Sequence, residues 1–240
     1  MITLVDEIKP GKQNMKYFIR IIIFLLLIVS INTLQAQRIM GVLIGGINAT
    51  NVQGDDVFGF HKFGLNAGAA AVVPFSDNWS VTLETIYAQK GSYHKEGGRG
   101  MDYQKRHDYN QYKLVLNYVE VPLMVHFEDR EWLKVGAGFS YARLVEVKEW
   151  EDHVRIATTS LNDGPYDLND FSALLDLQFP IYQKLKFNFR YTFSLMAIRE
   201  REYQNVGAGE EKISKQYNQV LSFRLLWVFN EQSSRYSRRR

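Results

Sequence analysis

Histidines beside acidic and hydroxyl residues are the first candidates for chemistry in this sequence. The set lies in long polar segments and comprises His94, His107 and His153 with Ser92, Asp108 and Asp152. A hydroxyl activated by a histidine and an acid could transfer or remove acyl groups, as lipid-modifying enzymes do. The chain contains no G-x-S-x-G, no H-E-x-x-H and no phosphate-binding glycine loop. We therefore expect polar loop surface here, no catalytic residues and no enzyme.

Metal and cofactor binding find equally little support. The histidines, at positions 61, 94, 107, 126 and 153, lack the spacing of metal ligands, and the chain has no cysteine. The absence of cysteine excludes disulfides, thiolate sites and the lipid-bearing cysteine of a lipoprotein. Asp55-Asp56 after Gly54 resembles the start of a calcium loop, but the rest of that pattern is missing. We predict no metal site and no cofactor.

A second set of charged residues lies inside alternating apolar runs. Its members are Glu84, Glu120, Asp176, Arg190 and Arg224. Isolated charges in a narrow protein interior are costly, so acids and bases there should pair. We predict a network of Glu84, Glu120, Arg190 and Arg224 that plugs a barrel lumen, with a structural rather than a catalytic role.

Strands must position these charges. Residues 112–149 form two long runs of alternating apolar and polar residues around the charged turn 128–131, which predicts an antiparallel hairpin. The same period of two recurs along the chain and predicts six further strands, at about 39–48, 62–73, 79–93, 171–179, 185–199 and 217–229. Pro122 falls inside a strand, where we expect a β-bulge or a water-bridged gap.

The connections between these strands alternate between a few residues and long polar segments. The predicted fold is therefore all-β: an eight-stranded antiparallel up-and-down transmembrane β-barrel with short periplasmic turns and long outer loops. In strand 185–199 one face carries bulky residues from Leu185 to Leu195, and the other carries Lys186, Asn188 and Arg190. Eight strands leave little interior room, so we expect bulky residues to face lipid and small or charged residues to face inward.

The ends of the chain carry separate signals. Lys16 and Arg20 precede an apolar run over 21–31 and a small residue at Ala36, which predicts a cleavable signal peptide over 1–36. A membrane-anchor helix is the alternative, but the run is shorter than the roughly 20 residues that span a bilayer. Two interpretations of residues 1–14 stay open: they lie upstream of a true start at Met15, or they form a longer N-terminal region of the signal peptide. The barrel would occupy 37–230, followed by a basic tail at 231–240.

Several short motifs carry a family resemblance. They are Gly45-Gly46-Ile47-Asn48, Gly54-Asp55-Asp56, Phe60-His61-Lys62-Phe63-Gly64, Gln89-Lys90-Gly91 and Tyr118-Val119-Glu120-Val121-Pro122-Leu123. In this order and spacing they resemble the Bacteroidetes outer-membrane β-barrel family often labelled PorT-like, over 37–230. A proline after the Glu-Val pair recurs in that family, which implies that Pro122 is tolerated. The resemblance implies residence in the outer membrane. The family takes its name from a component linked to type 9 secretion, but no feature of this sequence ties it to that component in particular.

We expect a narrow, plugged barrel with a structural or loop-mediated binding role. The expected partners are outer-membrane lipid and lipopolysaccharide, the barrel-assembly machinery and an unidentified envelope protein. The net charge of +3 gives no case for nucleic acid, and we expect a monomer. The alternatives are a small pore or type 9 secretion accessory, a lipid-modifying outer-membrane enzyme, and a soluble periplasmic lipocalin-like binder.

Overall fold

The computed structural model describes residues 39–54, 59–95, 111–129, 132–162, 164–204 and 211–230. The chain divides into two compact units, Met1–Gln37 and Arg38–Arg240, and all the described residues belong to the second. The predicted signal peptide at 1–36 and the basic tail at 231–240 therefore lie outside the described residues. Within the described ranges, no helix is long and apolar enough to cross a membrane.

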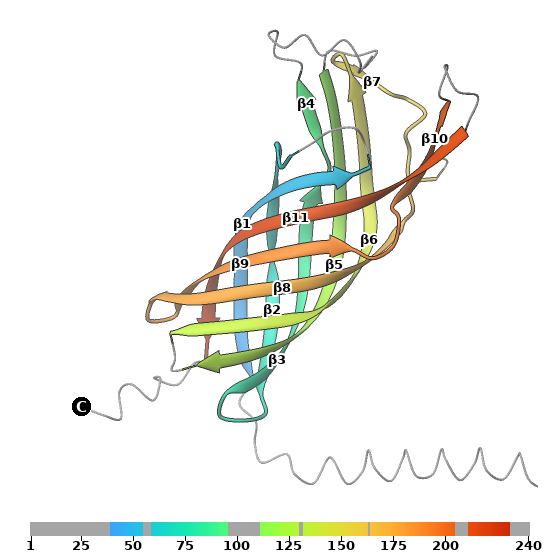
Figure 1. Ribbon diagram of the computed structural model, residues 1–240. Helices are drawn as coiled ribbons and strands as arrows, with labels where there is room; N and C mark the ends of the chain where they lie inside the picture. The colour runs from blue at the N-terminus through green and yellow to red at the C-terminus, as the bar shows by residue number, and fades with distance from the viewer. Residues whose placement is uncertain are drawn as a thin grey trace, which may run out of the picture. The chain divides into compact units, whose positions relative to one another are not determined.

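Eight long strands close into a ring of hydrogen bonds (Figure 1). They are β1 (Met40–Gln53), β2 (Lys62–Pro74), β3 (Trp79–Lys90), β5 (Gln111–Asp129), β6 (Leu133–Glu151), β8 (Asn169–Tyr182), β9 (Leu185–Ser194) and β11 (Glu211–Phe229). Each strand pairs antiparallel with the next, and β11 returns to β1 from Gly41↔Phe229 to Gln53↔Tyr217. This closure confirms the predicted eight-stranded antiparallel barrel.

Three short strands continue the long ones at the end opposite the short turns (Figure 1). β4 (Tyr93–Lys95) pairs with β5, β7 (Val154–Arg155) with β6, and β10 (Arg199–Gln204) with β11. Two of the predicted strands, 79–93 and 185–199, are thus interrupted near this end. Gly91 lies in the break between β3 and β4 with φ +132°. Glycine suits this position because a Cβ there would lie 2.1 Å from the Leu114 carbonyl oxygen.

Bulky apolar side chains face outward along the ring, as predicted. Leu123, Phe139 and Leu175 are 53%, 55% and 61% exposed, whereas Glu84 and Arg224 are 2% and 1% exposed. A surface this apolar on every strand suits acyl chains and not water. Trp79 and Phe127 pack at 5.0 Å beside the short turns, where an aromatic belt meets the membrane interface.

The interior is less polar than predicted. Neighbouring strands bury an apolar cluster of Val42, Ile44, Val72, Ile86, Ala88, Leu226 and Val228, whose members on β1, β2 and β11 lie toward the short turns. A second apolar cluster, built around Tyr112, Leu114, Leu116 and Leu144, fills the outer end. The prediction that small and charged residues face inward therefore holds in the middle of the lumen and misses the apolar clusters toward its two ends. Closely packed apolar side chains leave few spaces large enough for water.

Pro122 leaves a gap without a bulge. The ladder between β3 and β5 runs to Leu83↔Leu123 and resumes at Ile86↔Glu120 in unchanged register. Proline has no N–H to donate, so the pairing lapses locally while the strands stay aligned. The register shift of β5 lies elsewhere, between Asn117 and Tyr118. Of the two features expected at Pro122, the gap is present and the bulge is not.

Candidate functional site

A four-membered ionic cluster occupies the middle of the barrel. Arg190 donates to both carboxylate oxygens of Glu84, at 2.9 and 2.8 Å, and to Asp176 at 2.8 Å. Arg224 donates to Glu84 at 3.0 Å and to Asn188 at 2.7 Å. Two acids and two bases thus neutralise one another out of contact with water, the condition under which buried charges are tolerated. We call this set the central cluster.

Glu120 lies apart from the central cluster. Its carboxylate contacts the ammonium of Lys90 at 2.7 Å, and Lys90 also contacts Asp170 at 3.3 Å. Asp170 accepts further hydrogen bonds from Ser194 at 2.9 Å and Asn218 at 3.1 Å. The structure therefore brings together three of the four residues of the predicted network, and places Glu120 in a second group around Lys90.

His126 attaches a further strand to the central cluster. Its Nε2 lies 3.0 Å from Asp176, and its Nδ1 lies 3.1 Å from the hydroxyl of Thr82. A hydroxyl, an imidazole and a carboxylate in sequence resemble the parts of a nucleophilic triad. The enclosed space beside Thr82 measures only about 30 Å³, and His126 is wholly buried. The arrangement leaves no room for a substrate, so these contacts act as structural hydrogen bonds.

A β-bulge determines which side chains of β6 face inward near the outer end. Tyr118 pairs with Leu144 while Asn117 pairs with Glu146, so Val145 is the extra residue. Beyond it the alternation of β6 reverses, and Glu149 points inward instead of outward. The sequence pattern gives no sign of this reversal, because the residues on either side still alternate.

Glu149 organises a buried polar group at the outer end, beyond the apolar band. Tyr112 donates to it at 2.7 Å and Thr159 at 2.6 Å, while Arg199 lies 3.4 Å away and donates to Tyr166 at 2.8 Å. Burial, followed by the neighbouring Glu149 carboxylate, raises the pKa of Tyr166 to about 12. These bonds fasten the segment that carries Thr159 and Tyr166 to Glu149 on β6.

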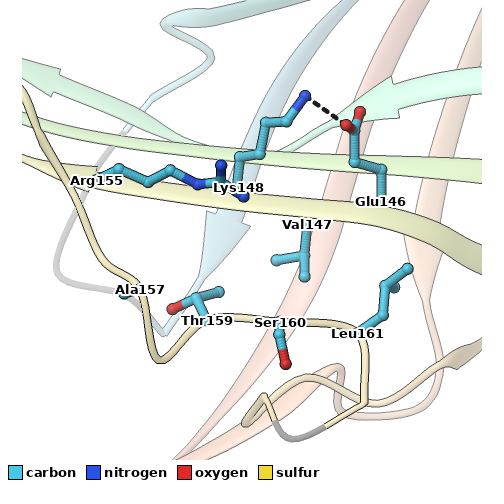
Figure 2. A pocket seen from close by; sticks show the side chains of 8 residues that line it. All are labelled: Glu146, Val147, Lys148, Arg155, Ala157, Thr159, Ser160 and Leu161. Carbon is cyan, nitrogen blue, oxygen red and sulfur yellow. Dashed lines mark ion pairs between the residues drawn. The ribbon is translucent and has the colours of Figure 1, made fainter.

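A groove of about 570 Å³ opens beside this fastened segment (Figure 2). It is lined by Glu146, Val147, Lys148, Arg155, Ala157, Thr159, Ser160 and Leu161. Lys148 forms an ion pair with Glu146, as Figure 2 shows. The groove is far larger than the two enclosed interior spaces, of about 30 and 10 Å³, and it is the best candidate for a binding site in the described part of the chain.

The histidines proposed for acyl chemistry are spread over the outer end. His94 lies on β4 opposite Tyr112, and His153 is exposed in the turn between β6 and β7. Asp152, in the same turn, accepts from the Gln111 amide at 3.0 Å. Ser92 is buried, and His107, Asp108, Asp55 and Asp56 lie outside the described residues. Within the described ranges, no three histidines and acids are placed to hold a metal ion.

Sequence reasoning missed Lys90, Asp170, His126 and Glu149. Lys90 lies an even number of residues from Glu84 on β3, so both side chains point inward. The alternation of the strand therefore contained the signal that Lys90 would need a buried partner. Asp170 lies at the start of β8, inside a segment that was predicted to be loop. His126 has the inward parity of Glu120, but only the three-dimensional register shows its partner.

Comparisons with solved structures return other small outer-membrane proteins. Ail, the attachment invasion locus protein of Yersinia pestis, is 12% identical, with a TM-score of 0.45, 80% of this chain covered and 99% of Ail. Neisserial surface protein A is 10% identical, with a TM-score of 0.45 and coverages of 79% and 97%. OprG from Pseudomonas aeruginosa is 10% identical, with a TM-score of 0.36 and coverages of 79% and 95%.

No curated protein matches the chain significantly in sequence. A family model described as outer membrane protein beta-barrel domain matches residues 35–200, which is more than half of the chain. Together with the closed ring and its lipid-facing side chains, this match shows that the alternative of a soluble periplasmic binder is wrong. The chain belongs to the outer membrane protein β-barrel domain family and is a small β-barrel protein of the cell outer membrane.

Proposed function

We propose that this protein is a sealed, non-enzymatic barrel that acts through its outer loops and through the integrity of the membrane around it. The observation that carries the proposal is the ion pair of Glu84 on β3 with Arg190 on β9. In the ring order these strands are four steps apart in either direction, so the pair spans the full width of the lumen. A solute would have to break it to pass.

Two further features support a sealed lumen. Lys90 bridges Glu120 and Asp170 closer to the outer end, and the apolar cluster around Leu226 closes the end near the short turns. The spaces left between these layers, of about 30 and 10 Å³, hold a few water molecules at most. Successive polar and apolar layers of this kind favour a plug over a pore.

The outer surface of the barrel indicates which lipids surround it. Its apolar side chains suit outer-membrane lipid, and the residues beyond them suit lipopolysaccharide. We propose a monomer that is inserted by the barrel-assembly machinery, uses no cofactor and binds no nucleic acid. The PorT-like motifs of the sequence support an origin in Bacteroidetes and leave a secretion accessory, with an envelope protein as partner, as the second candidate.

Conductance tests the proposal. Purified protein, folded in detergent and shown to be folded by heat-modifiable migration on gels, is added to a planar lipid bilayer. We expect no unitary current from the natural chain. Stable stepwise currents that disappear when the protein is heat-denatured before addition would overturn the plug and favour the pore. Changed lipid A chemistry in cells that express the protein, compared with a deletion strain, would favour an enzyme.

A further inference from the structure

One edge of β6 loses its neighbour strand at the outer end. β7 pairs with Trp150 and Glu151, and the Ile156 amide still donates to the Glu149 carbonyl at 2.9 Å. The chain then turns away, with the Thr159 amide 3.4 Å from the Ile156 carbonyl. On the other side of the gap, β8 first reaches β6 where the Leu144 amide donates to Leu168 at 2.8 Å. Among the described residues, no strand covers 145–148 on this side.

The backbone of Val147 faces this gap. The Asp152 amide donates to Gln111 at 2.9 Å, so residues 146, 148, 150 and 152 direct their backbone groups toward β5. Glu149 directs its carbonyl the other way, toward Ile156. Val147 has the same parity as Glu149 and is opposite Leu116 in a pair without hydrogen bonds. Its N–H and C=O therefore point out of the ladder, into the space that β7 has left.

The groove follows this free edge. Its wall includes Glu146, Val147 and Lys148, three consecutive residues whose side chains alternate between the two faces of β6. Ala157, Thr159, Ser160 and Leu161 line the other side of the groove (Figure 2). The 2.6 Å hydrogen bond from Thr159 to Glu149 fixes that side in place. A groove lined by both faces of one strand runs along its edge, where an added strand would lie.

The charges around the groove favour one kind of occupant. Lys148 and Arg155 are cationic, and Glu146 alone is anionic, so the lining carries one excess positive charge. Glu146 already pairs with Lys148 and accepts from Asn117 at 2.6 Å. Arg155, which is exposed, is the cation best placed to meet an incoming acidic side chain.

We propose that the groove binds an extended segment of another polypeptide, which adds to the free edge of β6 through the backbone of Val147 and presents an acidic side chain to Arg155. Main-chain hydrogen bonds would allow segments of many different sequences to bind, and Arg155 would favour those that carry an acidic residue. This inference rests on the proposed loop-mediated role, because it names the class of partner that the outer end would bind.

Two substitutions at one residue test the edge. Val147→Pro removes the N–H that points into the groove. It keeps every hydrogen-bond donor of the β5–β6 ladder, because the Val147 N–H takes no part in that ladder. Val147→Ala is the matched control, because it also removes the buried side chain but keeps the N–H. The probe is a fluorescently labelled hexapeptide amide of alternating threonine and valine with one central glutamate, followed by anisotropy with the folded barrel in detergent.

We expect the probe to bind the natural chain and the Val147→Ala variant, and to bind the Val147→Pro variant about tenfold more weakly, as for one lost hydrogen bond. Replacing glutamate by lysine in the probe, or Arg155→Gln in the protein, should weaken binding about threefold. A probe that fails to bind the natural chain, or equal binding to the proline and alanine variants, would overturn the inference. If the peptide test fails but the protein gives no current in a planar bilayer, the groove inference is refuted and the proposal of a sealed barrel is not.

Discussion

The guanidinium of Arg190 and the carboxylate of Glu84 meet at 2.8 and 2.9 Å from opposite walls of the barrel. Glu84 also accepts from Arg224 at 3.0 Å, so a single carboxylate serves two guanidinium groups that are both almost fully buried. Removing that carboxylate leaves Asp176 as the remaining acid of the central cluster. The cost should be large, because an unpaired buried charge is far less favourable than a pair.

Glu84→Gln should therefore lower the free energy of unfolding by about 3–5 kcal/mol, as for a broken buried ion pair. The measurement is a urea titration of folding into lipid vesicles, read by heat-modifiable migration. The control is Glu128→Gln, which removes a partly exposed carboxylate 3.2 Å from Lys134 and should change stability by less than about 1 kcal/mol. Equal effects of the two substitutions would show that the central cluster contributes no more than a surface pair.

Gly136 keeps open the space in which His126 reaches Asp176. It pairs with His126 on β5 and with Asp176 on β8, and a Cβ there would lie 2.3 Å from the imidazole and 2.6 Å from the carboxylate. Gly136→Ala should destabilise the barrel by about 1–3 kcal/mol through overpacking. Gly45→Ala is the control, because its Cβ would meet nothing within 4 Å. A Gly136→Ala variant as stable as Gly45→Ala would contradict this packing.

Much of the barrel could be predicted from the alternation of residue types. The ring of eight strands and the outward position of Leu123 follow from period two and from the scarcity of interior room. Ion-pair partners could not be predicted, because they depend on which residues the register brings to the same depth. Glu120 meets Lys90 on the adjacent strand and not Arg190, although all three have inward parity. The bulge at Val145, which turns Glu149 inward, adds one residue without disturbing the local pattern.

Lys90 offers a test of the second ionic group. Lys90→Met leaves the buried Glu120 carboxylate without its cation, and we expect a loss of about 3 kcal/mol or more. Asp170 is less affected because Ser194 and Asn218 still donate to it. Adding Glu120→Gln to Lys90→Met should therefore recover most of the stability in the same vesicle assay. A double variant no more stable than Lys90→Met would mean that Asp170, and not Glu120, depends on the lysine.

The outer polar group should respond to alkaline pH. The pKa of Tyr166 is raised to about 12 from an ordinary value near 10, so the folded state holds this proton more tightly than the unfolded chain. Its contribution to stability is complete below about pH 10 and is lost as the pH rises through about 12. Ionisation would place a phenolate beside the Glu149 carboxylate and release the segment around Tyr166 from β6.

Ultraviolet absorbance of phenolate, followed against pH, should thus show a late step after the ionisation of the ordinary tyrosines, with faster proteolysis around Tyr166 over the same pH range. Tyr166→Phe should reduce the late step, while Tyr182→Phe, at an exposed position beside a short turn, should leave it intact. Because Tyr112 donates to the same carboxylate at 2.7 Å, Tyr112→Phe should also reduce it. Ionisation of every tyrosine in one step near pH 10 would show that the pKa of Tyr166 is not raised, and would contradict the prediction.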